Sequence, residues 1–305
     1  MPEKIHDKGY KRILSKKKNF LDLLKNFVKA SWVESVKESD LELIDKEFIP
    51  QDFREKESDI IYKVRLGEKE AIFYFLIELQ STVDYTIPLR LLVYTVELYK
   101  RLFLDASEND REKKGFRLPP VVPCVLYNGE SAWTAASRFR EYLDGFETFG
   151  DHIIDFKYVL LNVNNFTDES LHEIGDLVSS IFLLDKKQDT KRFLQNLKWV
   201  LKATEGLVQD EQIELKDWLS DVLTKKAKGE NKEVIEEMLK LQKKGDVDEM
   251  TYAIERMMDD LETKGMERAV RVIRLQNRGV STASIANEMN MDEGDVKSII
   301  AMYEK

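Results

Sequence analysis

The sequence predicts an α/β fold in which a helix-crossed mixed β-sheet is followed by an all-α C-terminal region. Short apolar runs typical of strands lie at residues 41–49, 59–80, 121–127 and 154–163. Amphipathic helical spacing precedes the first of these strand regions and recurs between the second and the third. Beyond about residue 167, apolar residues recur mainly at helical spacing, so we expect helices from there onward.

Length and composition are typical of a globular protein. The chain has 305 residues, of which 43% are hydrophobic and 34% charged. No run approaches the roughly 20 apolar residues that a membrane span needs, and Met1 to Lys18 lacks an apolar signal core. We therefore expect a cytoplasmic protein. The single cysteine, Cys124, excludes an internal disulfide and a cysteine-based zinc cluster, and its apolar surroundings predict burial.

Charge is unevenly distributed along the chain. The net charge is −9, but residues 1–30 hold nine Lys or Arg against three acids. Residues 206–262 hold nine Lys or Arg against sixteen acids, so much of the acidity belongs to the helical region. A basic N-terminal arm can meet phosphates locally. The alternative is that Lys16 to Lys18 form a solvated helix start.

The first elements follow from apolar spacing. Residues 17–31 form an amphipathic helix, and residues 41–49 form a strand ended by Pro50. Residues 59–65 and 71–80 then form a hairpin around a turn at 66–69.

The next elements complete the sheet. Pro88 suits the first turn of a helix that runs to about residue 104, and residues 105–117 form a loop. Val121 to Tyr127 is a strand that is at an edge, or begins at one, because its prolines cannot donate to a ladder. Ile154 to Val163 is expected to be a further strand.

The C-terminal region divides into two predicted parts. Apolar stripes at 171–181 and 193–201 precede charged amphipathic helices at 210–263, broken near Gly229 and Gly245. A basic helix at 266–278, a short helix at 285–289 and a final helix capped by Asp292 resemble a helix-turn-helix. This last module reads DNA or serves packing and dimerisation. The expected divisions are residues 1–165, 166–264 and 265–305.

An acid pair marks the candidate catalytic site. Asp59 opens one hairpin strand and Glu78 closes the next, so antiparallel pairing places both acids at the same end. Gln80 joins the face of Glu78 if the strand continues. Two carboxylates can hold Mg²⁺ through oxygen contacts, and the metal can activate water for phosphodiester cleavage. Exposed strand ends would explain the same two acids without catalysis.

The following helix offers two supporting residues. Arg90, Tyr94 and Glu97 share one helical face. Arg90 could contact a phosphate bidentately, or it could pair with Asp84 or Glu97. Tyr94 could hydrogen-bond the phosphate or Gln80, but we favour its packing in the core.

Several motifs, in order, resemble one known family. They are His6 to Lys8, Phe48 to Tyr62, Phe75 to Asp84 with Arg90 and Tyr94, and Leu118 to Gly129. The chain resembles the bacterial recombination-promoting nucleases (Rpn), also named as transposases, within the PD-(D/E)XK nuclease superfamily. The resemblance covers roughly residues 5–200.

The resemblance implies an αβββαβ restriction-endonuclease-like core and a DNA endonuclease that uses a divalent metal. It implies Asp59 and Glu78 as the metal-binding acids, and Gln80 at the position where lysine is usual. Glutamine cannot accept a proton at neutral pH, so the proton acceptor is unassigned. Asp7, Asp22 and Glu34 are not carried over as further acids, and the sequence shows no triad of the DDE transposase type.

We therefore expect a Mg²⁺-dependent DNA endonuclease linked to recombination or mobile elements. A catalytically weak or inactive DNA-binding regulator on the same fold is one alternative, which Gln80 would suit. An oligomeric interaction module is the other. DNA is the expected partner, no membrane is expected, and the C-terminal helices are the surface for any homo-oligomer.

Overall fold

The computed structural model describes residues 3–28, 31–44, 60–67, 69–78, 83–129, 131–203, 206–226, 236 and 247–303. Its described strands form one mixed sheet in the order β1-β2-β3-β4-β5. The first three strands pair antiparallel, and β3, β4 and β5 run parallel. The strands are β1 (Leu41–Leu43), β2 (Ile60–Leu66), β3 (Lys69–Glu78), β4 (Val121–Tyr127) and β5 (Val159–Asn162).

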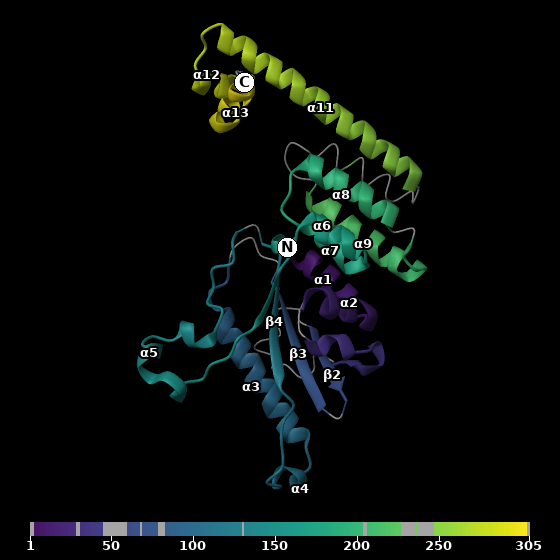
Figure 1. The fold of residues 1–305 in the computed structure, drawn as a ribbon, viewed down its shortest axis with the longest axis vertical. Helices are drawn as coiled ribbons and strands as arrows, with labels where there is room; N and C mark the ends of the chain where they lie inside the picture. Colours follow the sequence, from purple (N-terminus) through teal and green to yellow (C-terminus); the bar gives the residue numbers. More distant parts are fainter. Residues whose placement is uncertain are drawn as a thin grey trace.

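Helices cover both faces of this sheet (Figure 1). Helix α3 packs on one face, and helices α1 and α2 lie on the other, beneath a helical region that begins at residue 168. The helices with the sheet are α1 (Glu3–Leu14), α2 (Lys17–Phe27), α3 (Ile87–Asp105), α4 (Glu108–Arg111) and α5 (Phe146–Phe149). Those that follow are α6 (Asp168–Ile174), α7 (Leu177–Asp185), α8 (Thr190–Ala203), α9 (Gln209–Lys226), α11 (Val247–Asn277), α12 (Thr282–Met289) and α13 (Glu293–Tyr303).

The two faces of the sheet have separate apolar cores because strand side chains alternate in direction. Tyr62 and Phe73 pack into the larger core with α1, α2 and α6 to α9. Ile61 and Ile72, one residue away on each strand, pack into the smaller core beneath α3. Cys124 is fully buried in the larger core, as predicted, and burial raises the pKa of its thiol.

The predicted order of helix, three strands, helix and strand is confirmed, with α2 ending at Phe27 and the hairpin turning at Gly67. Strand β4 begins at an edge as expected. Pro123 pairs only with β3, and β5 joins from Cys124 onward, so the proline removes no bond from the second ladder. The predicted strand at 41–49 is described only at Leu41–Leu43, and residues 45–50 lie outside the described part.

Three local expectations are wrong. The loop at 105–117 contains α4, whose first turn is capped by Ser107 accepting a bond from the Asp110 N–H at 3.1 Å. The strand expected from Ile154 begins only at Val159, because Asp155 is paired to Arg138 in the preceding segment. The stripe at 171–181 divides into α6 and α7.

That division has a local cause. Gly175 ends α6 in the left-handed conformation at φ +64°, and Asp176 starts α7 by accepting a bond from the Ser179 N–H at 2.6 Å. Gly175 lacks the Cβ that makes this conformation costly for other residues.

The C-terminal helices also differ from expectation in one respect. Helix α11 is continuous from Val247 to Asn277, so the basic helix does not begin at Met266. Packing of its first half against α8, through buried residues such as Ile254 and Met257, outweighs the local cost of Gly265. Ser281 caps the following helix α12, and Asn290 ends it in the left-handed conformation.

Candidate active site

The carboxyl ends of the three parallel strands meet at one edge of the sheet. Glu78, the last residue of β3, pairs in register with Tyr127 of β4, which in turn pairs with Asn162 of β5. Adjacent strands lie about 4.8 Å apart, so these three positions form a short row across the edge. Ligands in open α/β sheets bind at this kind of edge, where loops rather than ladders continue the chain.

The acid pair predicted from the sequence is tied to this edge by the hairpin register. Ile60, the residue after Asp59, pairs with Phe75, three residues before Glu78. The beginning of β2 therefore lies beside the end of β3, as expected. Asp59, Gln80 and the side chain of Glu78 lie outside the described part of the structure, so their proposed convergence remains a prediction. The described side chains contain no group of three potential metal ligands among His, Cys, Asp and Glu.

Arg90 makes the acidic contact that the sequence offered as its alternative. Its Nη1 donates to Asp84 Oδ2 at 2.6 Å, and the same carboxylate accepts bonds from the Thr86 N–H and hydroxyl. Burial opposes ionisation of Asp84, but the bonds from Thr86 and Arg90 outweigh it and lower the pKa of the carboxyl. The charge of Arg90 is therefore offset locally, at the start of α3.

Tyr94 lies within the smaller core, where only 4% of its surface is exposed. It packs with Leu91 and Leu98 of the same helix and with Val125 of β4. These surroundings agree with the core role that we favoured for Tyr94. The residue supports the placement of α3 on the sheet, beside the strand that leads to the candidate edge.

A polar cluster that the sequence did not single out holds the loop after β4. Asn128 Nδ2 donates to Asp185 Oδ2 at the end of α7. Tyr10 of α1 donates its hydroxyl to the same oxygen at 2.8 Å. Burial and then the charge of Asp185 raise the pKa of Tyr10 well above its usual value, so the phenol remains a donor. Three distant segments thus meet one residue beyond the position paired with Glu78.

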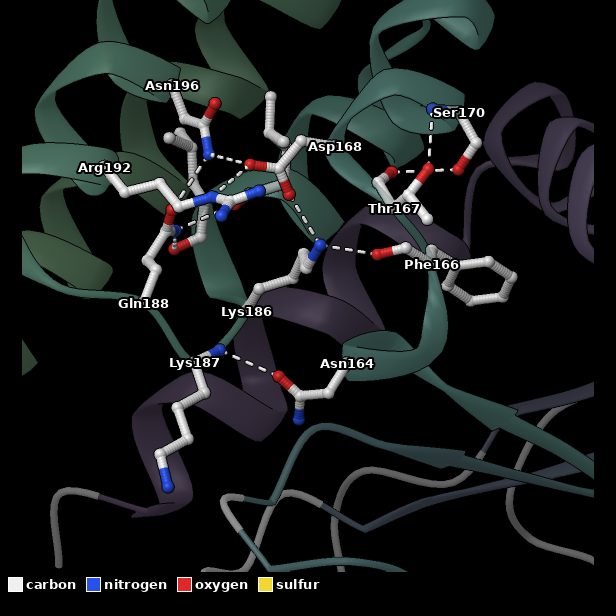
Figure 2. A network of polar contacts seen from close by, with 12 residues as sticks. Asn164, Phe166, Thr167, Asp168, Ser170, Lys186, Lys187, Gln188, Arg192 and Asn196 are labelled. Atoms are coloured by element: carbon white, nitrogen blue, oxygen red, sulfur yellow. Dashed lines mark hydrogen bonds and ion pairs between the residues drawn. The ribbon is translucent and has the colours of Figure 1, made fainter.

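A second set of bonds fixes the same loop from its other side. Asn164 Nδ2 donates to the carbonyl oxygen of Gly129 at 2.9 Å and more weakly to that of Asn128 at 3.5 Å. Asn164 Oδ1 accepts the backbone N–H of Lys187 at 2.8 Å, as Figure 2 shows. The loops after β4 and β5 are therefore joined to the segment between α7 and α8.

Next to this junction, Asp168 is the centre of a buried charge network (Figure 2). Its carboxylate accepts bonds from Lys186 at 2.6 Å, Arg192 at 2.7 Å and Asn196 at 2.9 Å. Burial would raise the pKa of Asp168, but these three donors hold it well below its usual range. Lys186 also donates to the carbonyl oxygen of Phe166, so its ammonium is enclosed by protein acceptors. The network joins α6, α7 and α8 through polar contacts.

The basic N-terminal residues have partners within the protein. Lys16 lies 3.5 Å from Glu214, and Lys18 pairs with Glu211, both on α9. Lys18 is also within 3.6 Å of Asp22 in its own helix. The run lies at the start of α2, and the side chains of Lys16 and Lys18 are 61% and 52% exposed, so the structure agrees with a largely solvated helix start that also meets acids of α9. Contact of these lysines with a phosphate remains a prediction.

Among the described residues, no helix combines the length and apolar character that crossing a membrane requires.

Comparison with known proteins identifies the family of this chain. The chain is 33% identical over 89 residues to the recombination-promoting nuclease RpnA of Escherichia coli strain K12, a match that covers 29% of this chain and 28% of that protein. No solved structure matches the chain significantly. The family model described as "Putative transposase, YhgA-like" matches residues 4–215. Because this match covers more than half of its length, the chain belongs to the YhgA-like transposase family.

Proposed function

We propose that the protein is a metal-dependent DNA endonuclease and that Asp59 and Glu78 hold its Mg²⁺ ion. The observation that carries the proposal is the hairpin register, which brings the start of β2 beside the end of β3 at the carboxyl edge of the parallel strands. Family membership and the similarity to a recombination-promoting nuclease support DNA as the substrate. The order α2, β1, β2, β3, α3, β4 is compatible with a restriction-endonuclease-like core.

The residue types suit a hard divalent cation. Asp and Glu supply carboxylate oxygens, which are preferred by Mg²⁺, and the chain contributes no competing cysteine at this edge. When bound, the ion would lower the pKa of a water molecule and stabilise negative charge on the scissile phosphate. Gln80 would orient that water or the phosphate through its amide, since it cannot take up a proton.

The surrounding protein groups would position the DNA rather than perform the chemistry. Arg90, which pairs with Asp84 at the start of α3, would contact a phosphate through its guanidinium. The bonds of Asn128 and Asn164 would keep the neighbouring loop in place while DNA enters. Fixed loops reduce the entropy that must be lost when a substrate is aligned for reaction.

Cleavage of supercoiled plasmid DNA in Mg²⁺ tests the acid pair. We expect Asp59→Ala and Glu78→Ala each to lower the cleavage rate at least about a hundredfold, because each removes a charged metal ligand. Circular dichroism should show an unchanged fold. Glu70→Ala is the matched control, since Glu70 is an exposed acid on the same strand, about 26 Å from Glu78 by strand rise.

The results separate the alternatives. Equal cleavage by the wild type and both acid variants would disprove the active-site assignment. DNA binding without cleavage would favour the regulator with an inactive nuclease-like core, which the neutral Gln80 suits. Self-association without binding or cleavage of DNA would favour the interaction module. A divalent cation bound between the two carboxylates in a crystal would support the endonuclease directly.

A further inference from the structure

Lys187 differs from its charged neighbours in the helical region. Lys186 and Arg192 both pair with Asp168, while Lys191 pairs with Glu262. The Lys187 side chain is exposed, and no carboxylate among the described residues lies within ion-pairing distance of its ammonium group. Figure 2 shows this side chain extending away from the Asp168 network. The residue therefore presents an uncompensated positive charge to solvent.

The backbone of Lys187 is nevertheless fixed to the candidate edge. Its N–H donates to Asn164 Oδ1, and Asn164 in turn donates to the carbonyl oxygens of Asn128 and Gly129. Asn128 directly follows Tyr127, which pairs in register with Glu78. A short chain of hydrogen bonds thus connects Lys187 to the end of β4, which pairs with the end of β3 where the proposed acid Glu78 lies.

A DNA phosphate at this edge would require a positively charged side chain that is not already paired with an acid. Of the residues that the sequence nominates for phosphate contact, Gln80 is neutral and Arg90 is paired with Asp84. Asp185 and Asp189, each two residues from Lys187 along the chain, accept bonds from other donors: Asp185 from Tyr10 and Asn128, and Asp189 from the Arg192 N–H. A flexible lysine stem on a fixed backbone suits a phosphate, which accepts an ammonium from many directions.

We propose that Lys187 binds a backbone phosphate of the DNA strand that enters the proposed site. This inference rests on the proposed function for the identity of the ligand, but it concerns binding and needs no cleavage. The segment between α7 and α8 thereby supplies a positive charge to an edge whose strands carry two acids. The loop bonds of Asn128 and Asn164 set the distance between this charge and the end of β3.

Lys187→Ala is a clean test because the structural bond of residue 187 uses its backbone N–H, which alanine retains. We would measure the affinity for a fluorescently labelled DNA duplex by anisotropy, in EDTA, over a series of salt concentrations. The expected result is about a tenfold weaker affinity at 50 mM salt and a salt-dependence slope smaller by about 0.9, the value for one lost phosphate contact. Lys187→Arg should retain the wild-type slope.

The matched control is Lys114→Ala. Lys114 is an exposed lysine in the turn after α4, at the opposite end of the sheet (Figure 1), so this variant makes the same change in net charge. Its affinity and salt slope should equal those of the wild type. An unchanged slope in Lys187→Ala, an equal loss in Lys114→Ala, or a wild-type protein that does not bind the duplex would each overturn the proposal.

The same measurements keep this inference separate from the endonuclease proposal. If Asp59→Ala still cleaves DNA while Lys187→Ala loses one phosphate contact, the acid assignment fails and the role of Lys187 stands. If both acid variants lose cleavage while Lys187→Ala binds like the wild type, the endonuclease proposal stands and the role of Lys187 is refuted.

Discussion

Asp168 shows how a single buried carboxylate can organise a helical region. Only 8% of its side chain is exposed, and its partner Lys186 is 12% exposed. Two charges of opposite sign in such a setting roughly offset their own desolvation, so the pair adds little by itself. Removing one partner is different, because the remaining charge stays buried without compensation. The main effect of removing the Asp168 carboxylate would therefore be to leave the charge of Lys186 buried without a partner.

We expect Asp168→Asn to lower the free energy of unfolding by about 3 kcal/mol at neutral pH, because Lys186 would lose its counter-charge. The folded-state pKa of Asp168 is depressed, so its contribution is fully present above the unfolded value of about 3.9 and is lost as the pH falls below it. Urea unfolding at pH 7 and pH 3 should show the difference between variant and wild type narrowing at the lower pH. Glu173→Gln, a change at an exposed acid one turn further along α6, should have little effect at either pH.

At the same scale, the sequence predicted the acid pair but not the residues that support the edge. Asp59 and Glu78 follow from local hairpin logic, since a short turn determines which strand ends meet. The contacts of Asn128 with Asp185 and of Asp185 with Tyr10 join residues far apart in the chain. Such contacts depend on how helices dock on the sheet, which spacing alone does not specify. The only local signal was the Asn-Gly pair that ends β4.

Among the secondary-structure elements, α3 shows the closest connection between sequence and local structure. Pro88 lies in its first turn, as predicted, and the preceding turn is organised by Asp84. That carboxylate bonds to Thr86 just before the helix and to Arg90 within its first turn. The start of α3 is therefore fixed by one side chain that lies outside the helix.

Asp84→Ala should destabilise the protein by about 1–2 kcal/mol, because it removes the acceptor for bonds from Thr86 and Arg90. The pKa of Asp84 is lowered in the folded state, so this contribution exists above about pH 4 and declines as the pH falls further. Thermal unfolding monitored at pH 7 and pH 3.5 tests both statements.

Asp105→Ala at the other end of α3 is the control, because Asp105 and Arg101 form an exposed pair worth below about 0.5 kcal/mol. If Asp105→Ala lowered the stability as much as Asp84→Ala does, the loss would reflect the removal of any acid near α3 and not the specific bonds of Asp84. A loss in Asp84→Ala that does not depend on pH would refute the ionic contribution.

Secondary-structure elements were predicted well where the apolar pattern is strong. They were predicted poorly where tertiary contacts determine the local structure. Strand β4 agrees with its expected bounds, and α3 differs by a residue at either end. Helix α1 was not predicted, although Tyr10, Ile13 and Leu14 are spaced as one helical face and are buried. The strand expected from Ile154 is shortened by the ion pair between Asp155 and Arg138, a contact that the strand pattern does not contain.

At the scale of the whole molecule, the structure contains a third apolar cluster that is separate from the two cores of the sheet. Val272 of α11 packs there with Ile285 of α12 and with Val296 and Ile300 of α13. The helix-turn-helix pattern thus corresponds to a small helical module at the far end of α11, as Figure 1 shows. Residues 262–268, which lie between this cluster and the buried part of α11, are all exposed.

This arrangement predicts that the module can be removed without unfolding the rest. Among the side chains of α11 that the structure describes, the larger core includes those as far as Met257 and Met258, and the third cluster begins at Val272. A chain that ends at Lys264 should therefore keep its thermal midpoint within about 3 °C, a shift that corresponds to roughly 1 kcal/mol for a protein of this size. If the endonuclease proposal is correct, it should also retain metal-dependent cleavage, since the candidate edge lies in the sheet.

A chain that ends at Lys226 provides the contrast, because it also removes the half of α11 that packs on α8. Buried side chains such as Met250 and Ile254 would be lost, and the apolar surface that they cover would meet water. We expect this shorter chain to unfold at a much lower temperature and to bind the dye ANS. Equal destabilisation of both truncated chains would mean that the module at 265–305 contributes to the stability of the sheet through contacts outside its own apolar cluster, and the proposed division after residue 264 would be wrong.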